Sequence, residues 1–155
     1  MTFHLHALSN EPFEPLFSLS DDELIARGAR RVTADADHGF PCRISLQDAN
    51  AGDELILVNY KHLDSNSPYD AAHAIYVRKD VKQAHPDPGE VPAVLSSRLL
   101  SVRGFNEQRL MEHADVVEGT ELSIKLEEMF SNPAVSFVDI HNAKQGCFAA
   151  KATRC

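Results

Sequence analysis

The stretch 135-VSFVDIHNAKQGCFAAKAT-153 decides our interpretation of the fold. Two apolar segments, 135–141 and 147–153, flank five mostly polar residues, Asn142 to Gly146. Two β-prone segments joined by a short loop that contains glycine are typical of an antiparallel hairpin. We therefore expect this part of the chain to form a β-hairpin within an antiparallel sheet.

One face of the predicted hairpin carries a candidate catalytic set. With a five-residue loop, His141 and Cys147 oppose each other on one face, and Asp139 lies two residues earlier on that face. A thiol, an imidazole beside it and a carboxylate that orients the imidazole are what a cysteine nucleophile requires. A structural role is the commoner alternative, because cysteine is among the most buried residue types and Gly146 would simply allow a positive φ.

The loop and three other residues suggest a ligand-binding site. Asn142 and Lys144 lie in the loop, where they would donate to an anionic ligand. Arg43, Arg103 and Tyr69 lie on or beside other predicted strands, and arginines in clefts bind carboxylate and phosphate groups. Strand arginines are more often solvated or paired with carboxylates, so both interpretations stay open.

Working outward, local patterns predict about three short helices and several more strands. Ser20-Asp21-Asp22-Glu23 forms a capping box for a helix that ends near Gly28, and Pro92 and Thr120 begin two further helices. Apolar or alternating segments predict strands at 3–8, 29–34, 40–46, 55–60, 74–78, 99–105 and 111–117. The predicted fold class is α+β, with mainly antiparallel sheet, in a single domain of residues 1–155.

Composition and charge exclude several classes of partner. The formal net charge is −8, which repels nucleic-acid phosphates and anionic membranes, so we expect neither as a partner. The first residues lack the basic start and apolar run of a signal peptide, and three cysteines are too few for a disulfide framework. We expect a cytoplasmic protein with reduced thiols.

No cofactor or metal is expected from the sequence motifs. His4-Leu5-His6 and Asp35-Ala36-Asp37-His38 contain metal-ligating residue types, but neither matches a closed zinc pattern, and there is no C-x-x-C. The phosphate-binding, dinucleotide-binding and hydrolase motifs are also absent.

Five segments resemble a bacterial family of proteins of unknown function, number 1203. They are Gly39 to Arg43, Asn59 to His62, Ser67 to Tyr69, Ala114 to Gly119 and His141 to Ala149. Because they extend over most of the chain, the resemblance implies one folded unit. The family has no established activity, so the resemblance implies no mechanism.

Two functional hypotheses follow, and the sequence leaves open whether the protein is an enzyme. In the first, the protein binds a small polar or anionic metabolite, or acts on it, through the terminal hairpin. In the second, it is an interaction or homodimerisation protein that uses a sheet edge and has no small-molecule site. A pocket that encloses the polar hairpin residues and an arginine would favour the first, and a flat apolar surface around Phe105, Phe137 or Phe148 the second.

Overall fold

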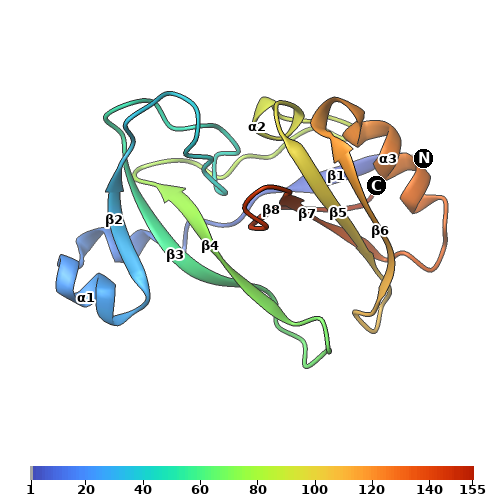
Figure 1. The fold of residues 1–155 in the computed structure, drawn as a ribbon, viewed down its shortest axis with the longest axis horizontal. Coiled ribbons are helices and arrows are strands. Elements are labelled where there is room, and N and C mark those ends of the chain that lie inside the picture. Colours follow the sequence, from blue (N-terminus) through green and yellow to red (C-terminus); the bar gives the residue numbers. More distant parts are fainter. Residues whose placement is uncertain (1) are drawn as a thin grey trace.

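The computed structural model describes residues 2–155 and contains two antiparallel sheets and short helices (Figure 1). The larger sheet has the strand order β1-β8-β7-β5-β6, and the smaller one has the order β2-β3-β4. The mainly antiparallel α+β fold predicted from the sequence is therefore confirmed. None of the helices within residues 2–155 is both long enough and apolar enough to cross a bilayer.

The five-stranded sheet and two helices enclose one hydrophobic core. Its strands are β1 (Phe3–His6), β5 (Leu99–Phe105), β6 (Met111–Glu118), β7 (Phe137–Asn142) and β8 (Phe148–Arg154), and the helices are α2 (Ala93–Ser96) and α3 (Leu122–Phe130). The helices pack on one face of the sheet, with Leu126 and Met129 against Leu100, Val102 and Ile140. The opposite face is left for the smaller sheet, which lies beside it in Figure 1.

The three-stranded sheet has its own core. Its strands are β2 (Ala29–Thr33), β3 (Glu54–Leu63) and β4 (Ala71–Arg78), preceded by the 3-10 helix η1 (Glu14–Ser18) and helix α1 (Asp21–Ala26). Ile56, Val58, Ile75 and Val77 pack in this core, and Phe148 from β8 of the other sheet joins them. Phe148 therefore fixes the C-terminal hairpin against the smaller sheet.

The two sheets also touch at the tips of two hairpins. Ser67, in the β3–β4 turn, donates a hydrogen bond from Oγ to the carbonyl of Arg109 at 2.7 Å, and the rings of Tyr69 and Phe105 meet edge to face. The space between the sheets is thus bordered by the hairpin β7–β8, by strand β4 and by the start of β5.

Two predicted elements differ from those observed. Residues 40–46 form a tight turn instead of a strand, in which the amide of Leu46 donates to the carbonyl of Cys42 and Leu46 has a φ of +52°. The alternation that predicted a strand does reflect burial, since Cys42, Ile44 and Leu46 are all buried. Helix α3 begins without a side-chain cap, because residues Gly119–Glu121 form a 3-10 turn, η2, in place of the cap expected at Thr120.

The capping box of helix α1 yields a first prediction. Ser20 Oγ accepts from the amide of Glu23 at 3.2 Å, and Glu23 accepts from the amide of Ser20 at 3.3 Å. Because Ser20→Ala removes one of these bonds, we expect the free energy of unfolding in urea to fall by about 1 kcal/mol. Ser18→Ala is the control, since no hydrogen bond of the Ser18 side chain is found within residues 2–155, and a change of equal size there would contradict the prediction.

Candidate functional site

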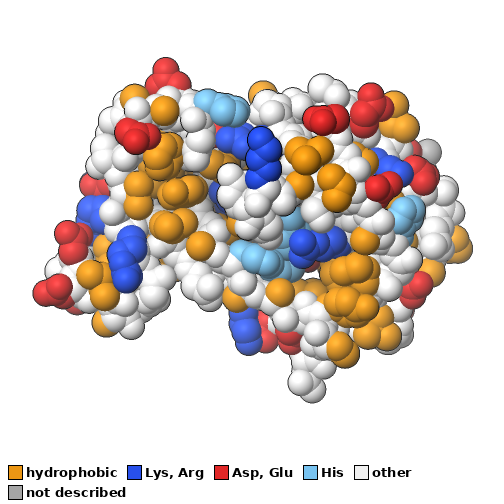
Figure 2. Space-filling view, in the orientation of Figure 1, with side chains coloured by type: hydrophobic (Ala, Val, Ile, Leu, Met, Phe, Trp, Pro, Cys, Tyr) orange, Lys and Arg blue, Asp and Glu red, His pale blue; other side chains and the backbone are white. Residues whose placement is uncertain are grey.

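A pocket of about 690 Å³ lies between the two sheets. Strands β3 and β4 and the turn at 38–43 form one wall, while the hairpin loop, the start of β5 and the end of β6 form the other. In Figure 2, histidine and basic side chains gather on the surface between the sheets. The polar and charged side chains in the lining are His38, Arg43, His73, Tyr76, Ser97, Arg98, Glu118, Asn142, Lys144, Gln145 and Cys147.

Arg43 joins the turn of the smaller sheet to the C-terminal hairpin. Its Nε donates to the carbonyl of Phe148 at 2.8 Å, one terminal nitrogen donates to the carbonyl of Pro41 at 2.6 Å, and the other contacts Cys147 Sγ at 3.0 Å. The residue is 2% exposed, and this burial lowers the pKa of the guanidinium. Arg43 was predicted as a ligand-binding residue, and it lies in the pocket wall.

The register of the hairpin differs from the predicted one. Asn142 faces Cys147, so only residues 143–146 form the loop and His141 pairs with Phe148; a bulge then interrupts the ladder between His141 and Ile140. The expected pairing of His141 with Cys147 is therefore wrong. The bulge follows from tertiary contacts, since the Phe148 side chain packs in the core of the smaller sheet and its carbonyl accepts from Arg43.

The loop itself supports one part of the prediction. Gly146 has a φ of +78°, as its place in the loop suggested, and its amide donates to the carbonyl of Asn142 at 2.7 Å. Asn142 is 5% exposed, and its Nδ2 points at Cys147 Sγ at 3.6 Å. Lys144 is exposed at the loop tip and lines the pocket. The loop thus brings three predicted site residues, Asn142, Lys144 and Cys147, into one wall.

His141 faces the smaller sheet instead of Cys147. The residue is fully buried, and its Nδ1 lies 3.0 Å from the carbonyl oxygen of Gly146. Burial and the nearby charge of Arg103 lower the pKa of His141 to about 3, so the ring is neutral at physiological pH. A neutral imidazole offers a lone pair to a cation or a proton donor.

Asp139 orients a different histidine from the one predicted. Its two carboxylate oxygens contact His62 Nδ1 at 2.9 Å and Lys151 Nζ at 2.8 Å. Burial by itself raises the pKa of Asp139, but His62 and Lys151 outweigh it and hold that pKa below the usual value. Asp139 is therefore an ionised, fully buried carboxylate that fixes His62.

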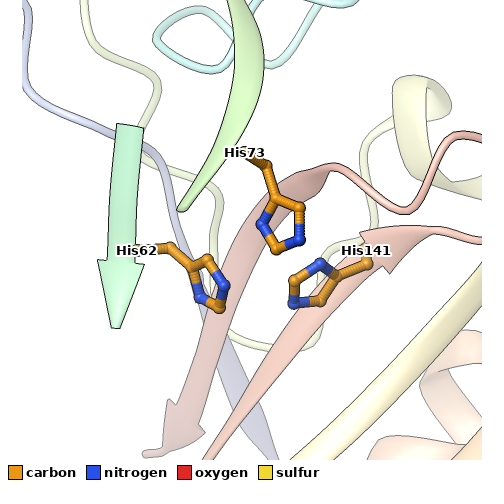
Figure 3. Close-up of side chains that lie close together, drawn as sticks. All are labelled: His62, His73 and His141. Atoms are coloured by element: carbon orange, nitrogen blue, oxygen red, sulfur yellow. The ribbon is translucent and has the colours of Figure 1, made fainter. Parts of the chain in front are cut away.

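Three histidines, His62, His73 and His141, converge where the sheets meet (Figure 3). No sequence motif joins them, because they come from three different strands. One signal for His73 was present in the sequence. It lies two and four residues before the core residues Ile75 and Val77, so its side chain is on the same, inward face of the strand. His73 also lines the pocket, so the cluster lies at its edge.

The remaining predicted residues lie at different distances from the pocket. Arg103 pairs with Asp139 in the strand register and donates to Ser101 Oγ at 3.2 Å. Burial lowers the pKa of Arg103, and its charge lowers the pKa of His73 and of His141. Tyr69 is outside the pocket lining, 42% exposed and packed against Phe105. The site is thus made of two adjoining parts, a pocket with basic side chains and a cluster of three imidazoles.

Comparison with known proteins identifies only a family. No curated protein and no solved structure matches the chain. The model of the family described as "Protein of unknown function (DUF1203)" matches residues 39–154, which include the pocket residues from Gly39 onward and all three histidines of the cluster. Because this match covers most of the 155 residues, the chain belongs to the DUF1203 family of proteins of unknown function.

Proposed function

We propose that the protein binds a small anionic metabolite in the pocket between the sheets, either as a binding domain or as a small enzyme. The observation that carries the proposal is the set of cationic side chains in the lining, Arg43, Arg98 and Lys144, in a chain whose net charge is −8. They come from three separate segments, and the lining contains one carboxylate, Glu118. A volume of about 690 Å³ fits the usual size of a small-molecule site.

The charge of Arg43 supports an anionic ligand in particular. Arg98 is already paired with Asp48 at 2.6 Å, but the three bonds of Arg43 go to two backbone carbonyls and the sulfur of Cys147, and none goes to a carboxylate. Within residues 2–155 no carboxylate forms an ion pair with Arg43 or with Lys144. A buried guanidinium without a carboxylate partner is costly, and an anion in the pocket would compensate its charge.

The alternative interaction protein receives less support. It required an apolar surface around Phe105, Phe137 or Phe148, but Phe105 and Phe148 are each 2% exposed, and Phe137 is half-buried with Lys151 Nζ 3.9 Å from the centre of its ring. The pocket instead encloses Asn142, Lys144 and Cys147 together with arginines, which was the expectation for small-molecule binding. We also propose a cytoplasmic location; the free thiols of Cys42, Cys147 and Cys155 are usual for cytosolic proteins.

A charge reversal at the loop tip tests the proposal. Inorganic phosphate and succinate, titrated by NMR in the presence of a chelator, are expected to shift amide signals of the pocket wall in a saturable way. Because Lys144→Glu replaces a cation by an anion at the pocket, we expect affinity to fall at least about tenfold, which corresponds to 1.4 kcal/mol.

Lys82→Glu is the matched control, since Lys82 is also exposed but lies outside the pocket lining. It makes the same change of net charge and should leave the affinity within about twofold of the wild type. Equal losses in both variants, or no saturable binding of either anion, would count against an anion site in this pocket.

A further inference from the structure

We propose that His62, His73 and His141 bind one divalent transition-metal ion of the zinc type at the edge of the pocket. This inference goes beyond the anion pocket and does not depend on it. It stands on four observations about the cluster: its convergence, its buried ring nitrogens, the partners of its outer nitrogens and its position beside the pocket.

The first observation is that two irregularities in the sheets lie at or beside residues of the cluster. In the β3–β4 ladder, Lys61 pairs with Ala72 and Leu63 with Ala71, so His62 is an extra residue in a bulge. In the β7–β8 ladder a second bulge occurs beside His141. Bulges re-aim side chains and are common next to functional sites. Both therefore occur at residues of the cluster.

The second observation concerns the ring nitrogens. His62 Nε2, His73 Nδ1 and His141 Nε2 are buried, and none has a hydrogen-bond partner among residues 2–155. One nitrogen from each ring lies within 4.8 Å of those from the other two rings. Buried polar atoms are nearly always satisfied, so three unsatisfied nitrogens in one place indicate a missing partner.

The outer nitrogens show what kind of partner this is. The Gly146 carbonyl only accepts, so His141 Nδ1 must donate to it, which leaves a lone pair on His141 Nε2. An ionised Asp139 likewise accepts from His62 Nδ1, and in the neutral tautomer that this bond selects the lone pair is on His62 Nε2. The missing partner therefore does not accept a hydrogen bond from these two nitrogens. It interacts with their lone pairs, as a metal ion does.

This arrangement also matches the support that metal-binding histidines usually have. Such histidines typically donate their second ring nitrogen to a carboxylate or a backbone carbonyl, which fixes the tautomer and the ring orientation. Asp139 does this for His62, and Gly146 does it for His141. Asp139 is itself held by Lys151 at 2.8 Å, so the support extends one step further.

The ligand set favours an ion of the zinc type over a hard cation. Imidazole suits zinc, iron, copper or nickel, whereas calcium and magnesium require oxygen ligands. Nitrogens around a tetrahedral ion are roughly 3.4 Å apart, so ring nitrogens that lie within 4.8 Å of one another need to close by at most about 1.4 Å. Three protein ligands leave one coordination position open, as in catalytic zinc sites. Since His73 lines the pocket, this open position is next to the bound anion proposed above.

Zinc affinity of the metal-free protein tests the inference. We expect one zinc ion per chain, with a dissociation constant below about 1 µM, in competition with a chromophoric chelator. His73→Gln should weaken binding at least about 100-fold because one of three ligands is lost. Asp139→Asn should weaken it by about 10–100-fold through the orientation of His62.

His6→Gln is the matched control. His6 and His4 form the other close histidine pair on a strand, with ring centroids 4.8 Å apart, and His6 is exposed. This variant should keep the wild-type zinc affinity. Loss of affinity in His6→Gln equal to that in His73→Gln, or wild-type binding no tighter than that of His73→Gln, would overturn the inference.

A measurement on the unaltered protein covers variants that fail to fold. The imidazole nitrogen resonances of His62, His73 and His141 should shift when zinc is added, while those of His4 and His6 stay in place. Unchanged resonances of the three would show that the cluster is structural. The Lys144→Glu variant should bind zinc like the wild type, so failure of the anion pocket and failure of the metal site are separately visible.

Discussion

Gly119→Ala should lower the free energy of unfolding by about 4 kcal/mol, the largest effect that we expect from one methyl group in this chain. A Cβ at this position would lie 2.0 Å from the carbonyl oxygen of Leu95 and 2.7 Å from that of Arg98. Both atoms are backbone, so neither can rotate away. The turn η2 therefore packs on the end of α2 only because residue 119 has no side chain.

The same change also reaches the pocket. Arg98, Leu99 and Glu118 line it, and the amide of Gly119 donates to the carbonyl of Arg98 at 2.8 Å. A shift of this contact would displace the wall that carries Arg98. We therefore expect the alanine variant to bind phosphate more weakly under conditions in which it is still folded.

Gly104→Ala is the matched control for urea unfolding. Gly104 is also buried and has no positive φ, but a Cβ there would first meet Met129 Cε at 3.0 Å, the end of a flexible side chain. We expect a cost of about 1–2 kcal/mol for this variant. If Gly119→Ala lowered the free energy of unfolding no more than Gly104→Ala does, the contact between α2 and η2 would adjust at little cost, which would contradict the prediction.

Local sequence signals predicted local structure well. The capping box at Ser20 determines the start of α1 through contacts over three residues, and Gly146 determines the turn of the hairpin through its own φ. Most strands were found because apolar alternation along β1, β4 and β5 reflects one buried face. In each case the physical cause lies within the segment.

Residues 40–46 show where alternation fails. The pattern of Cys42, Ile44 and Leu46 suggested a strand with one buried face, but a turn buries the same three side chains. Arg43, which alternates with these three residues, is buried as well, because two of its hydrogen-bond partners are residues 147 and 148. Partners 104 or more residues away leave no local signal.

The candidate metal cluster was missed for the same reason. His62, His73 and His141 have no motif spacing, and their meeting requires the packing of two sheets, with His62 in a bulge of the β3–β4 ladder. The register of the terminal hairpin was missed because the loop was expected to extend from Asn142 to Gly146. Asn142 instead faces Cys147 and only residues 143–146 form the loop, so Phe148 and not Cys147 lies opposite His141.

Arg43→Ala should lower the free energy of unfolding by about 3 kcal/mol, the second large effect. The change leaves the carbonyls of Pro41 and Phe148 without the donor that now reaches them at 2.6 and 2.8 Å, and it opens a cavity between the sheets. The desolvation of the guanidinium, which opposes folding in the wild type, makes the loss smaller than the sum of its bonds.

Two variants and one control separate the contributions of Arg43. Arg43→Lys should recover little, because one ammonium on a flexible stem cannot replace a rigid fork that reaches both carbonyls and a thiol. Arg78→Ala removes another arginine of this sheet, paired with Asp53 but 30% exposed, and should cost about 0–1 kcal/mol in the same urea experiment. Equal costs for Arg43→Ala and Arg78→Ala would contradict the prediction.

Ligand-dependent stability connects this residue to the proposed function. A guanidinium has five N–H donors, and three of those on Arg43 are engaged by Pro41, Phe148 and Cys147, which leaves two for an anion in the pocket. A phosphate concentration of 100 times the dissociation constant of the wild type should therefore raise the free energy of unfolding of the wild type by about 2.7 kcal/mol. The Arg43→Ala variant should gain clearly less, because the buried charge that phosphate compensates is gone. If the variant gained as much as the wild type, the anion would bind elsewhere, and Arg43 would serve only to hold the hairpin against the smaller sheet.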